Sequence, residues 1–207
     1  MPPSQQHTAT SIRALGILLF DGVEVLDFAG PFEVFSVAGE LHPGLVRVVT
    51  VAETTRPITA VNGLSVNPAV AFDQAPHFDV LIVPGGSGTR ALLTSTTVLG
   101  WVARTHAGAQ HTLSICSGAR LFATLGLLDG KPYCTHHEVY PHLAELAPTG
   151  IPKPEHRFVQ TDATLYTSGG ISAGIDLSFH VLATMAGREV AQATADYMEY
   201  RWLPEGG

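Results

Sequence analysis

The sequence predicts an α/β fold in which a mostly parallel sheet is covered by helices on both faces. The first observation is the alternation of strand-like apolar runs with helix-like runs, which is typical of such sheets. The second is the composition: 45% of the 207 residues are hydrophobic and only 14% are charged, as expected for a chain with a large core. The length fits one domain. We expect a loose tail over residues 1–11 and a single domain over residues 12–207.

The first part of the chain predicts two core strands and one helix. Residues 12–20, "IRALGILLF", form an apolar run that ends at "DG" and predicts a buried strand. Apolar side chains at close to helical spacing follow over residues 25–40, where Pro31 marks a first turn or a kink. Residues 45–53 predict the second strand, and residues 62–72 predict a turn with a peripheral strand.

The middle of the chain predicts two further core strands, each followed by a helix. Residues 78–86, "FDVLIVPGG", read as a strand with a glycine pair at its carboxyl end. Residues 96–109 predict a helix. Residues 112–116, "TLSIC", predict the fourth strand, and a helix is expected from Ser117 to Leu125, stopped near Gly126.

The last part of the chain predicts a hairpin and three helices. Residues 138–148 indicate a short helix. Residues 157–170 read as a β-hairpin with "TDA" as its turn. Residues 173–187 and 188–202 predict two closing helices.

Ligands of parallel α/β sheets bind beyond the carboxyl ends of the strands. That rule selects three stretches, "FDGVEVLD", "VPGGSG" and "ICSGA". Because they follow different strands of one sheet, we expect them to share a cleft.

Cys116 lies at the junction between a predicted strand and a predicted helix. Such a tight turn crowds its neighbours, and the small residues Ser114 and Gly118 would relieve that crowding. This is the pattern of a nucleophile elbow with sulfur in place of oxygen. A helix amino terminus would lower the pKa of the thiol. The alternative is a small, inert, buried cysteine, and spacing alone leaves both interpretations open.

Two carboxylates precede the thiol in the chain. Glu24 and Asp27 are three residues apart, so they would share a face if the segment is already helical. A carboxyl group beside the sulfur would act as general acid or base. It would also raise the pKa of the cysteine unless it carries a proton, and the two groups would titrate as a pair. The alternative is that both residues only begin a helix, where the dipole favours them.

The glycine pair Gly85 and Gly86 would let backbone N–H groups approach a ligand closely. Those donors would stabilise an anion that develops near Cys116. The alternative is a plain turn.

Composition also excludes several classes of function. The formal net charge of −7 leaves no basic surface for nucleic acid, and no apolar run is long enough to span a bilayer. The first residues lack a secretion signal, and only two cysteines, Cys116 and Cys134, are present. We therefore expect a cytoplasmic protein with Cys134 as a structural thiol. The ten histidines match no metal-site spacing.

Four segments together resemble the ThiJ/PfpI superfamily, a class I glutamine amidotransferase-like group. They are "LLFDGVEVLDFAGPFEVF", "DVLIVPGGSGTRAL", "SICSGARLFATLGLLDGKPYCTHH" and "YTSGGISAGIDLSFHVL". The resemblance covers about residues 12–200 and implies a flavodoxin-like three-layer sandwich with a nucleophile-elbow cysteine. "LDFAGP" and "ICSGA" are most similar to the isocyanide (isonitrile) hydratase branch.

The resemblance also implies roles for individual residues. Cys116 matches the nucleophile, Asp27 matches its acidic partner and Glu24 does not. Ser117 matches the hydroxyl residue after the cysteine, with serine in place of threonine, and Gly85 and Gly86 match the glycine pair near the thiol. The branch implies a small-molecule substrate, a homodimer and no cofactor. Some relatives carry a fused DNA-binding module, which we do not expect after "YRWLPEGG".

The expected activity is the hydration of isocyanides to N-substituted formamides. Relatives with protease or glyoxalase-type activity often have histidine where this chain has Ser117. His136 would either approach Cys116 or be satisfied by the backbone. The alternatives are a glyoxalase-type or hydrolytic enzyme acting on small reactive carbonyls, and a non-enzymatic redox or ligand sensor in which Cys116 is oxidised.

Overall fold

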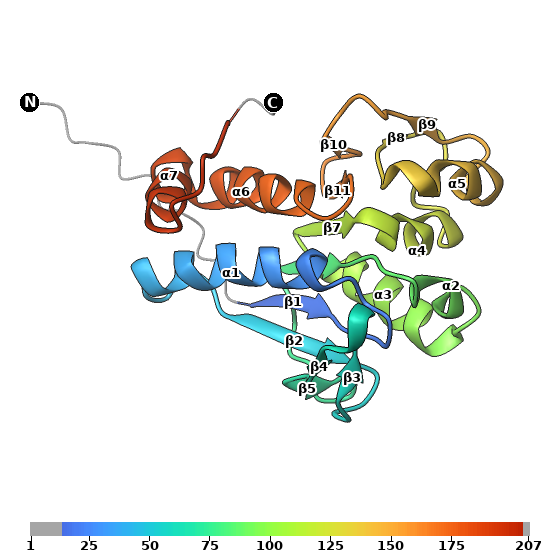
Figure 1. The fold of residues 1–207 in the computed structure, drawn as a ribbon, viewed down its shortest axis with the longest axis horizontal. Helices are drawn as coiled ribbons and strands as arrows, with labels where there is room; N and C mark the ends of the chain where they lie inside the picture. The colour runs from blue at the N-terminus through green and yellow to red at the C-terminus, as the bar shows by residue number, and fades with distance from the viewer. Residues whose placement is uncertain (1–13, 205–207) are drawn as a thin grey trace, which may run out of the picture.

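A computed structural model describes residues 14–204 and contains a central seven-stranded sheet (Figure 1). The strands lie in the order β10-β11-β7-β6-β1-β2-β5, and every neighbouring pair is parallel except the antiparallel pair β10 and β11. Their bounds are β1 Leu15–Leu18, β2 Val48–Ala52, β5 Val70–Ala71, β6 Val80–Val83, β7 His111–Ile115, β10 Phe158–Gln160 and β11 Leu165–Ser168. All residues of β1 and β6 are buried, as expected for strands covered on both faces.

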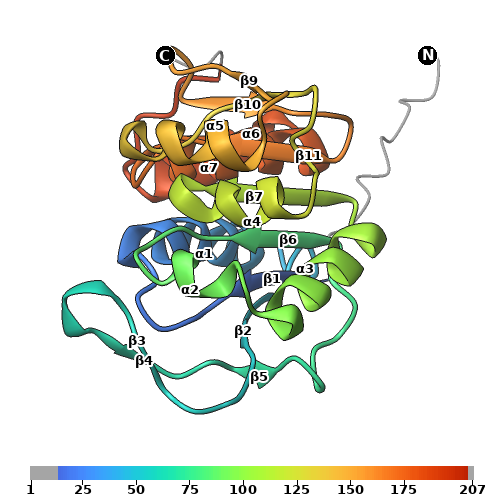
Figure 2. The same ribbon diagram turned by 90° about the vertical axis from the view of Figure 1, so that its right-hand side faces the viewer.

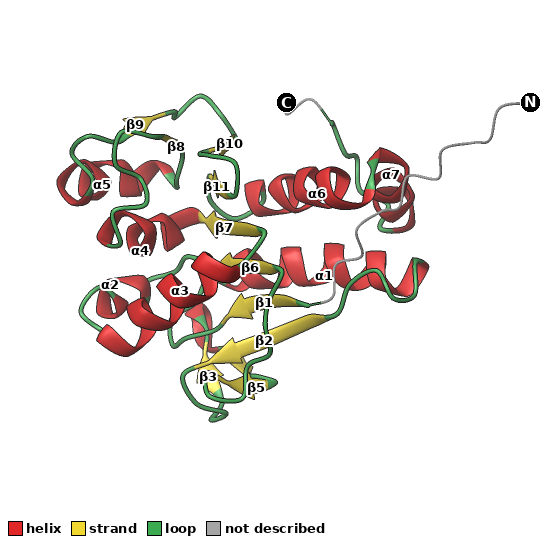
Figure 3. Cartoon of the chain, turned by 180° about the vertical axis from the view of Figure 1, so that it is seen from behind, coloured by secondary structure: helices red, strands yellow, loops and turns green. Residues whose placement is uncertain are grey.

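Helices cover both faces of this sheet, so the predicted three-layer sandwich is confirmed. Figures 1 and 2 show α1, α6 and α7 on one side and α2 to α5 on the other, and Figure 3 shows the same separation from behind. The first group is α1 Val25–Leu41, α6 Ala173–Ala186 and α7 Arg188–Tyr197. The second is α2 Thr89–Leu92, α3 Thr96–Gly108, α4 Ala119–Thr124 and α5 Tyr140–Leu146. Within the described residues, no helix is long and apolar enough to cross a membrane.

Four short strands lie in the loops outside the central sheet. β3 (Ile58–Thr59) and β4 (Ser65–Val66) form an antiparallel pair, and β8 (Pro132–Tyr133) and β9 (Ile151–Pro152) form a parallel one. Of these four, the sequence indicated only the region of β4. All four consist of two residues each, which is too short for a periodic pattern to appear.

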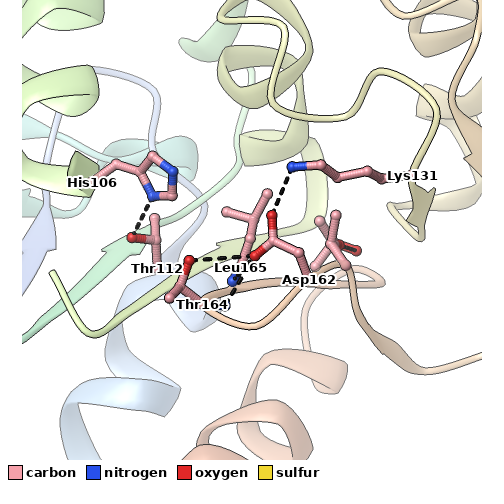
Figure 4. A network of polar contacts seen from close by, with 8 residues as sticks. His106, Thr112, Lys131, Asp162, Thr164 and Leu165 are labelled. Atoms are coloured by element: carbon pink, nitrogen blue, oxygen red, sulfur yellow. Dashed lines mark hydrogen bonds and ion pairs between the residues drawn. The ribbon is translucent and has the colours of Figure 1, made fainter.

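The predicted hairpin is present as β10 and β11, and the side chain of Asp162 orders its turn. The Oδ1 atom accepts hydrogen bonds from the N–H groups of Thr164 (2.9 Å) and Leu165 (2.8 Å). The Oδ2 atom pairs with Nζ of Lys131 at 2.7 Å (Figure 4). An aspartate that bonds its own backbone two or three residues ahead stabilises a turn. This turn leads the chain into β11, which pairs with β7.

Some predicted boundaries differ from the structure. The tail expected over residues 1–11 lies outside the described residues, and the strand expected over 12–20 is the shorter β1. The strand expected over 112–116 ends at Ile115. The helix expected from Ser117 begins instead as a 3-10 turn, Cys116–Gly118, before α4. The reason is the backbone of Cys116, whose φ of 55° fits neither a strand nor a right-handed helix.

Candidate active site

Cys116 occupies a strained turn directly after β7. Its positive φ of 55° is uncommon for a residue other than glycine. Its N–H donates to the carbonyl of Gly169 at 3.2 Å, and its own carbonyl accepts from Oγ1 of Thr135 at 2.6 Å. A Cβ at Gly118 would lie 2.2 Å from the carbonyl oxygen of Val83. The predicted elbow is therefore present, and it packs so closely on β6 that glycine is required two residues after the cysteine.

Asp27 reaches the elbow from the first turn of α1. Its side chain is fully buried, and its carboxylate accepts two backbone hydrogen bonds. Gly85 N–H donates to Oδ2 at 2.9 Å, and Ile171 N–H donates to Oδ1 at 3.2 Å. A Cβ at Gly85 would lie 2.8 Å from Oδ2 of Asp27 and 2.8 Å from Cβ of Cys116. The absence of a side chain at Gly85 thus lets the carboxylate and the thiol meet.

The carboxyl group of Asp27 and the thiol of Cys116 influence each other's pKa. Burial raises the pKa of Asp27 to about 7, with the charge of Glu24 adding to the effect and the Gly85 hydrogen bond opposing it. Burial and the neighbouring Asp27 raise the pKa of Cys116 to about 12. The expected lowering of the thiol pKa by a helix amino terminus is therefore wrong, because burial and the carboxylate outweigh it. Near neutral pH the carboxyl group of Asp27 loses its proton while the thiol of Cys116 keeps its own, and the two groups titrate as a coupled pair.

The glycine pair orients the residues around the thiol. Gly85 N–H bonds to Asp27, and Gly86 N–H donates to Oγ of Ser117 at 2.9 Å. The Ser117 hydroxyl in turn donates to the Gly86 carbonyl at 3.1 Å. Both glycine N–H groups are thus engaged, so the expectation that they face an anion beside Cys116 is wrong for this arrangement. Hydrogen bonds from the Ser117 N–H and hydroxyl lower the pKa of Cys116 against the larger opposing effects.

Glu24 and His136 both line the same cavity as Cys116. Glu24 has extended backbone just before α1, so it does not share a helix face with Asp27. Nδ1 of His136 accepts from the N–H of Glu138 at 3.3 Å. A Cβ at Gly170 would lie 2.3 Å from Cδ2 of His136 and 3.3 Å from Sγ of Cys116. The histidine therefore has a backbone partner and also faces the same small space as the sulfur.

A cavity of about 250 Å³ opens at Cys116. Its lining comes from the loops after β6, β7 and β11, the residue before α1, the segment between β8 and α5, and the helices α2 and α4. The lining residues are Glu24, Gly86, Ser87, Arg90, Cys116, Ser117, Arg120, His136, Glu138, Val139 and Ile171. In the part of the chain that the structure describes, no three histidine, cysteine or acidic side chains are grouped so as to hold a metal ion.

Sequence reasoning missed three contributors to this site. Ile171, which bonds to Asp27, follows the "SGG" at the carboxyl end of β11, so the strand-end rule applied to a fourth strand would have found it. Thr135 and Arg120 lie in a loop and in a helix with no sequence signal of their own. Cys134 is fully buried, and its Sγ lies 3.1 Å from the Thr167 carbonyl, in agreement with a structural role.

Comparisons with known proteins agree with this architecture. Residues 13–184 match the model of the DJ-1/PfpI family. Isonitrile hydratase of Pseudomonas putida is 32% identical over 92% of this chain and 79% of its own length. The transcriptional regulator GbdR of Pseudomonas aeruginosa is 28% identical over 97% of this chain, which spans 53% of the regulator. A ThiJ/PfpI family protein from Pseudomonas syringae has a crystal structure with a TM-score of 0.82 and 27% identity, covering 99% of this chain and 83% of that one.

Proposed function

Because this chain belongs to the DJ-1/PfpI family, we propose that it hydrates isocyanides to N-substituted formamides, with Cys116 as nucleophile and Asp27 as acid and base. The observation that carries the proposal is the buried carboxyl group of Asp27 beside the thiol of Cys116, which itself lines a small cavity. The similarity to an isonitrile hydratase supports the same substrate class.

The proposed reaction begins with the thiol proton. Asp27 accepts this proton from Cys116 and delivers it to the terminal carbon of R–N≡C as the sulfur attacks the same carbon, and the product is a thioimidate, S–CH=N–R. A carboxyl group whose pKa is about 7 both holds and releases a proton near neutral pH.

Water completes the proposed cycle. Asp27, now ionised, takes a proton from a water molecule that attacks the thioimidate carbon and passes this proton to the imine nitrogen. Collapse of the tetrahedral intermediate breaks the C–S bond, releases R–NH–CHO and returns the proton to the Cys116–Asp27 pair. The sum is one isocyanide plus one water, with no change in oxidation state and no further reactant.

The test is direct. The purified protein is incubated with an aryl isocyanide, and the formamide is quantified by chromatography. We expect formamide from the wild type and from Cys134→Ser, which removes the other thiol, and none from Cys116→Ala. Equal rates in wild type and Cys116→Ala would remove the thiol from the mechanism. Wild-type turnover in Asp27→Asn would remove the carboxyl group from it.

One observation favours a second candidate, a glyoxalase-type or hydrolytic reaction on a small reactive carbonyl. His136 faces the same space as Sγ of Cys116, which supplies a histidine that the sequence lacks at position 117. The same preparations are therefore assayed for lactate from methylglyoxal. Lactate without formamide, dependent on both Cys116 and His136, would establish this reaction in place of hydration.

A further inference from the structure

Arg120 is a buried cation beside the nucleophile. It lies on α4, one helical turn after Cys116, and only 3% of the residue is exposed to solvent. A buried charge is unfavourable unless it is paired or fully hydrogen-bonded. Among the described residues, Arg120 takes part in no ion pair. Its guanidinium therefore has no carboxylate partner among the described residues, and the neighbouring Cys116 is the group whose negative charge would raise its pKa.

The hydrogen bonds of Arg120 reach neutral groups and leave part of the guanidinium free. Nη1 donates to Oγ1 of Thr89 at 3.0 Å, and Nε donates to Nδ1 of His142 at 3.0 Å. Within the described part of the chain, Nη2 has no hydrogen-bond partner. The Thr89 hydroxyl also lies 3.3 Å from Oγ of Ser117. The guanidinium is thus held rigidly against the elbow, with donors left over.

Arg120 lines the same cavity as Cys116, and Arg90 lines it at an exposed position. Glu24 and Glu138 are the acidic residues of the lining, and neither lies within ion-pair distance of an arginine. Burial, and after it the charge of Arg90, lower the pKa of Arg120. A bound anion would offset the repulsion between the two guanidinium groups. The part of the cavity that the two arginines line is therefore electrostatically suited to a negative group.

We propose that the natural substrate carries a carboxylate, which the buried Arg120 binds in the cavity and the exposed Arg90 attracts. The proposal deepens the proposed hydration and rests on it: the substrate class becomes small isocyanides that bear a carboxylate. Two guanidinium donors suit a carboxylate because its two oxygens accept in the same plane. The cavity of about 250 Å³ fits a substrate of a few heavy atoms.

The decisive comparison uses two substrates that differ in one charge. Isocyanoacetate and methyl isocyanoacetate are hydrated to N-formylglycine and its methyl ester, and kcat/KM is measured for each. We expect the carboxylate to be preferred. In Arg120→Met the preference should fall by about 10- to 100-fold, the effect of losing a charge-assisted contact. Arg120→Lys keeps the charge but not the planar pair of donors, so it should retain part of the preference.

A binding measurement tests the carboxylate site independently of whether the protein hydrates isocyanides. N-formylglycine and its methyl ester are titrated calorimetrically into the wild type, Arg120→Met and Arg188→Gln. Arg188 is an exposed arginine that does not line the cavity, so its variant is the matched control. Circular dichroism confirms that each variant is folded. Arg90→Gln tests how much the second arginine contributes to carboxylate binding. Because Arg90 is exposed, this substitution should leave the fold intact.

The results together decide between the carboxylate site and the hydration reaction. A preference for the carboxylate that Arg120→Met abolishes and Arg188→Gln retains would support the proposal. Turnover of both substrates with equal kcat/KM would overturn it while leaving the hydration intact. Tight, Arg120-dependent binding of N-formylglycine without any turnover would uphold the carboxylate site and overturn the hydration. Neither turnover nor binding would overturn both.

Discussion

The buried carboxyl group of Asp27 should make this protein less stable as the pH rises. Its pKa lies at about 7 in the folded protein against 3.8 for the ordinary group, so the folded state binds more protons between these values. The stability that the protonated carboxyl group contributes is therefore fully present below the unfolded pKa and is lost as the pH rises through the folded pKa. At about 1.36 kcal/mol per unit, the full loss is about 4 kcal/mol, of which about 3 kcal/mol falls between about pH 4.5 and about pH 8.

Asp27→Asn isolates this effect. Asparagine has one acceptor oxygen where aspartate presents two, so one of the N–H groups of Gly85 and Ile171 loses its partner. That loss is about 1–3 kcal/mol at every pH. The variant carries no titrating group at the position, so it escapes the pH-dependent penalty. We expect it to gain about 3 kcal/mol relative to wild type between about pH 4.5 and about pH 8, and to be the more stable protein at the upper end.

The assay is urea denaturation of both proteins at a series of pH values. Because the thiol of Cys116 stays protonated below about pH 8 in both proteins and the other titrating residues are common to them, the difference between their free energies of unfolding reports on Asp27 in this range. A difference that stays constant with pH would refute the reasoning, since it would mean that the carboxyl group titrates alike in the folded and unfolded states. A difference that changes in the opposite direction would mean that the folded protein favours the carboxylate.

Three further predictions concern the elbow. Gly118→Ala places a Cβ 2.2 Å from the Val83 carbonyl oxygen, so urea denaturation should show a loss of about 1–3 kcal/mol; an unchanged midpoint would contradict the close packing. Thr135→Val removes the 2.6 Å hydrogen bond to the Cys116 carbonyl and should lower stability by about 1–3 kcal/mol, whereas Thr135→Ser should keep this hydrogen bond. Wild-type stability in Thr135→Val would contradict a role for the hydroxyl. Asp27→Asn removes a charge that raises the pKa of Cys116. Ultraviolet titration of the Cys116 thiolate should therefore give a lower pKa than in the wild type, although burial still keeps it above the ordinary value. An unchanged pKa would mean that the carboxylate does not act on the thiol.

The core of the fold was predictable because its strands are short, apolar and covered on both faces. β1, β6 and β7 follow directly from their hydrophobic runs, and the strand-end rule selected the loops that carry Asp27, Gly85 and Cys116. These strands are neighbours in the sheet, which is why three loops distant in sequence meet. The homodimer and the cytoplasmic location stay predictions.

The electrostatics of the site could not be predicted from local sequence. The pKa of Cys116 depends on how deeply neighbouring elements bury it, and spacing along the chain does not contain that information. The hydrogen bond from Ile171 to Asp27 joins residues 144 positions apart. Arg120 occupies an ordinary helical position, and only its packing against Thr89 and His142 shows that its charge lies inside the protein.

The hydrogen bonds that hold the backbone of Cys116 in its turn have a consequence for the evolution of this site. The N–H of Cys116 bonds to Gly169 and its carbonyl bonds to Thr135, so both anchors use main-chain atoms and neither involves the sulfur. A serine at this position would therefore find the same turn, the same carboxyl neighbour and the same cavity. Geometry is encoded in the backbone and its partners, while reactivity is encoded in one side chain. A lineage built on this fold can exchange its nucleophile in a single substitution without having to rebuild the scaffold that presents it.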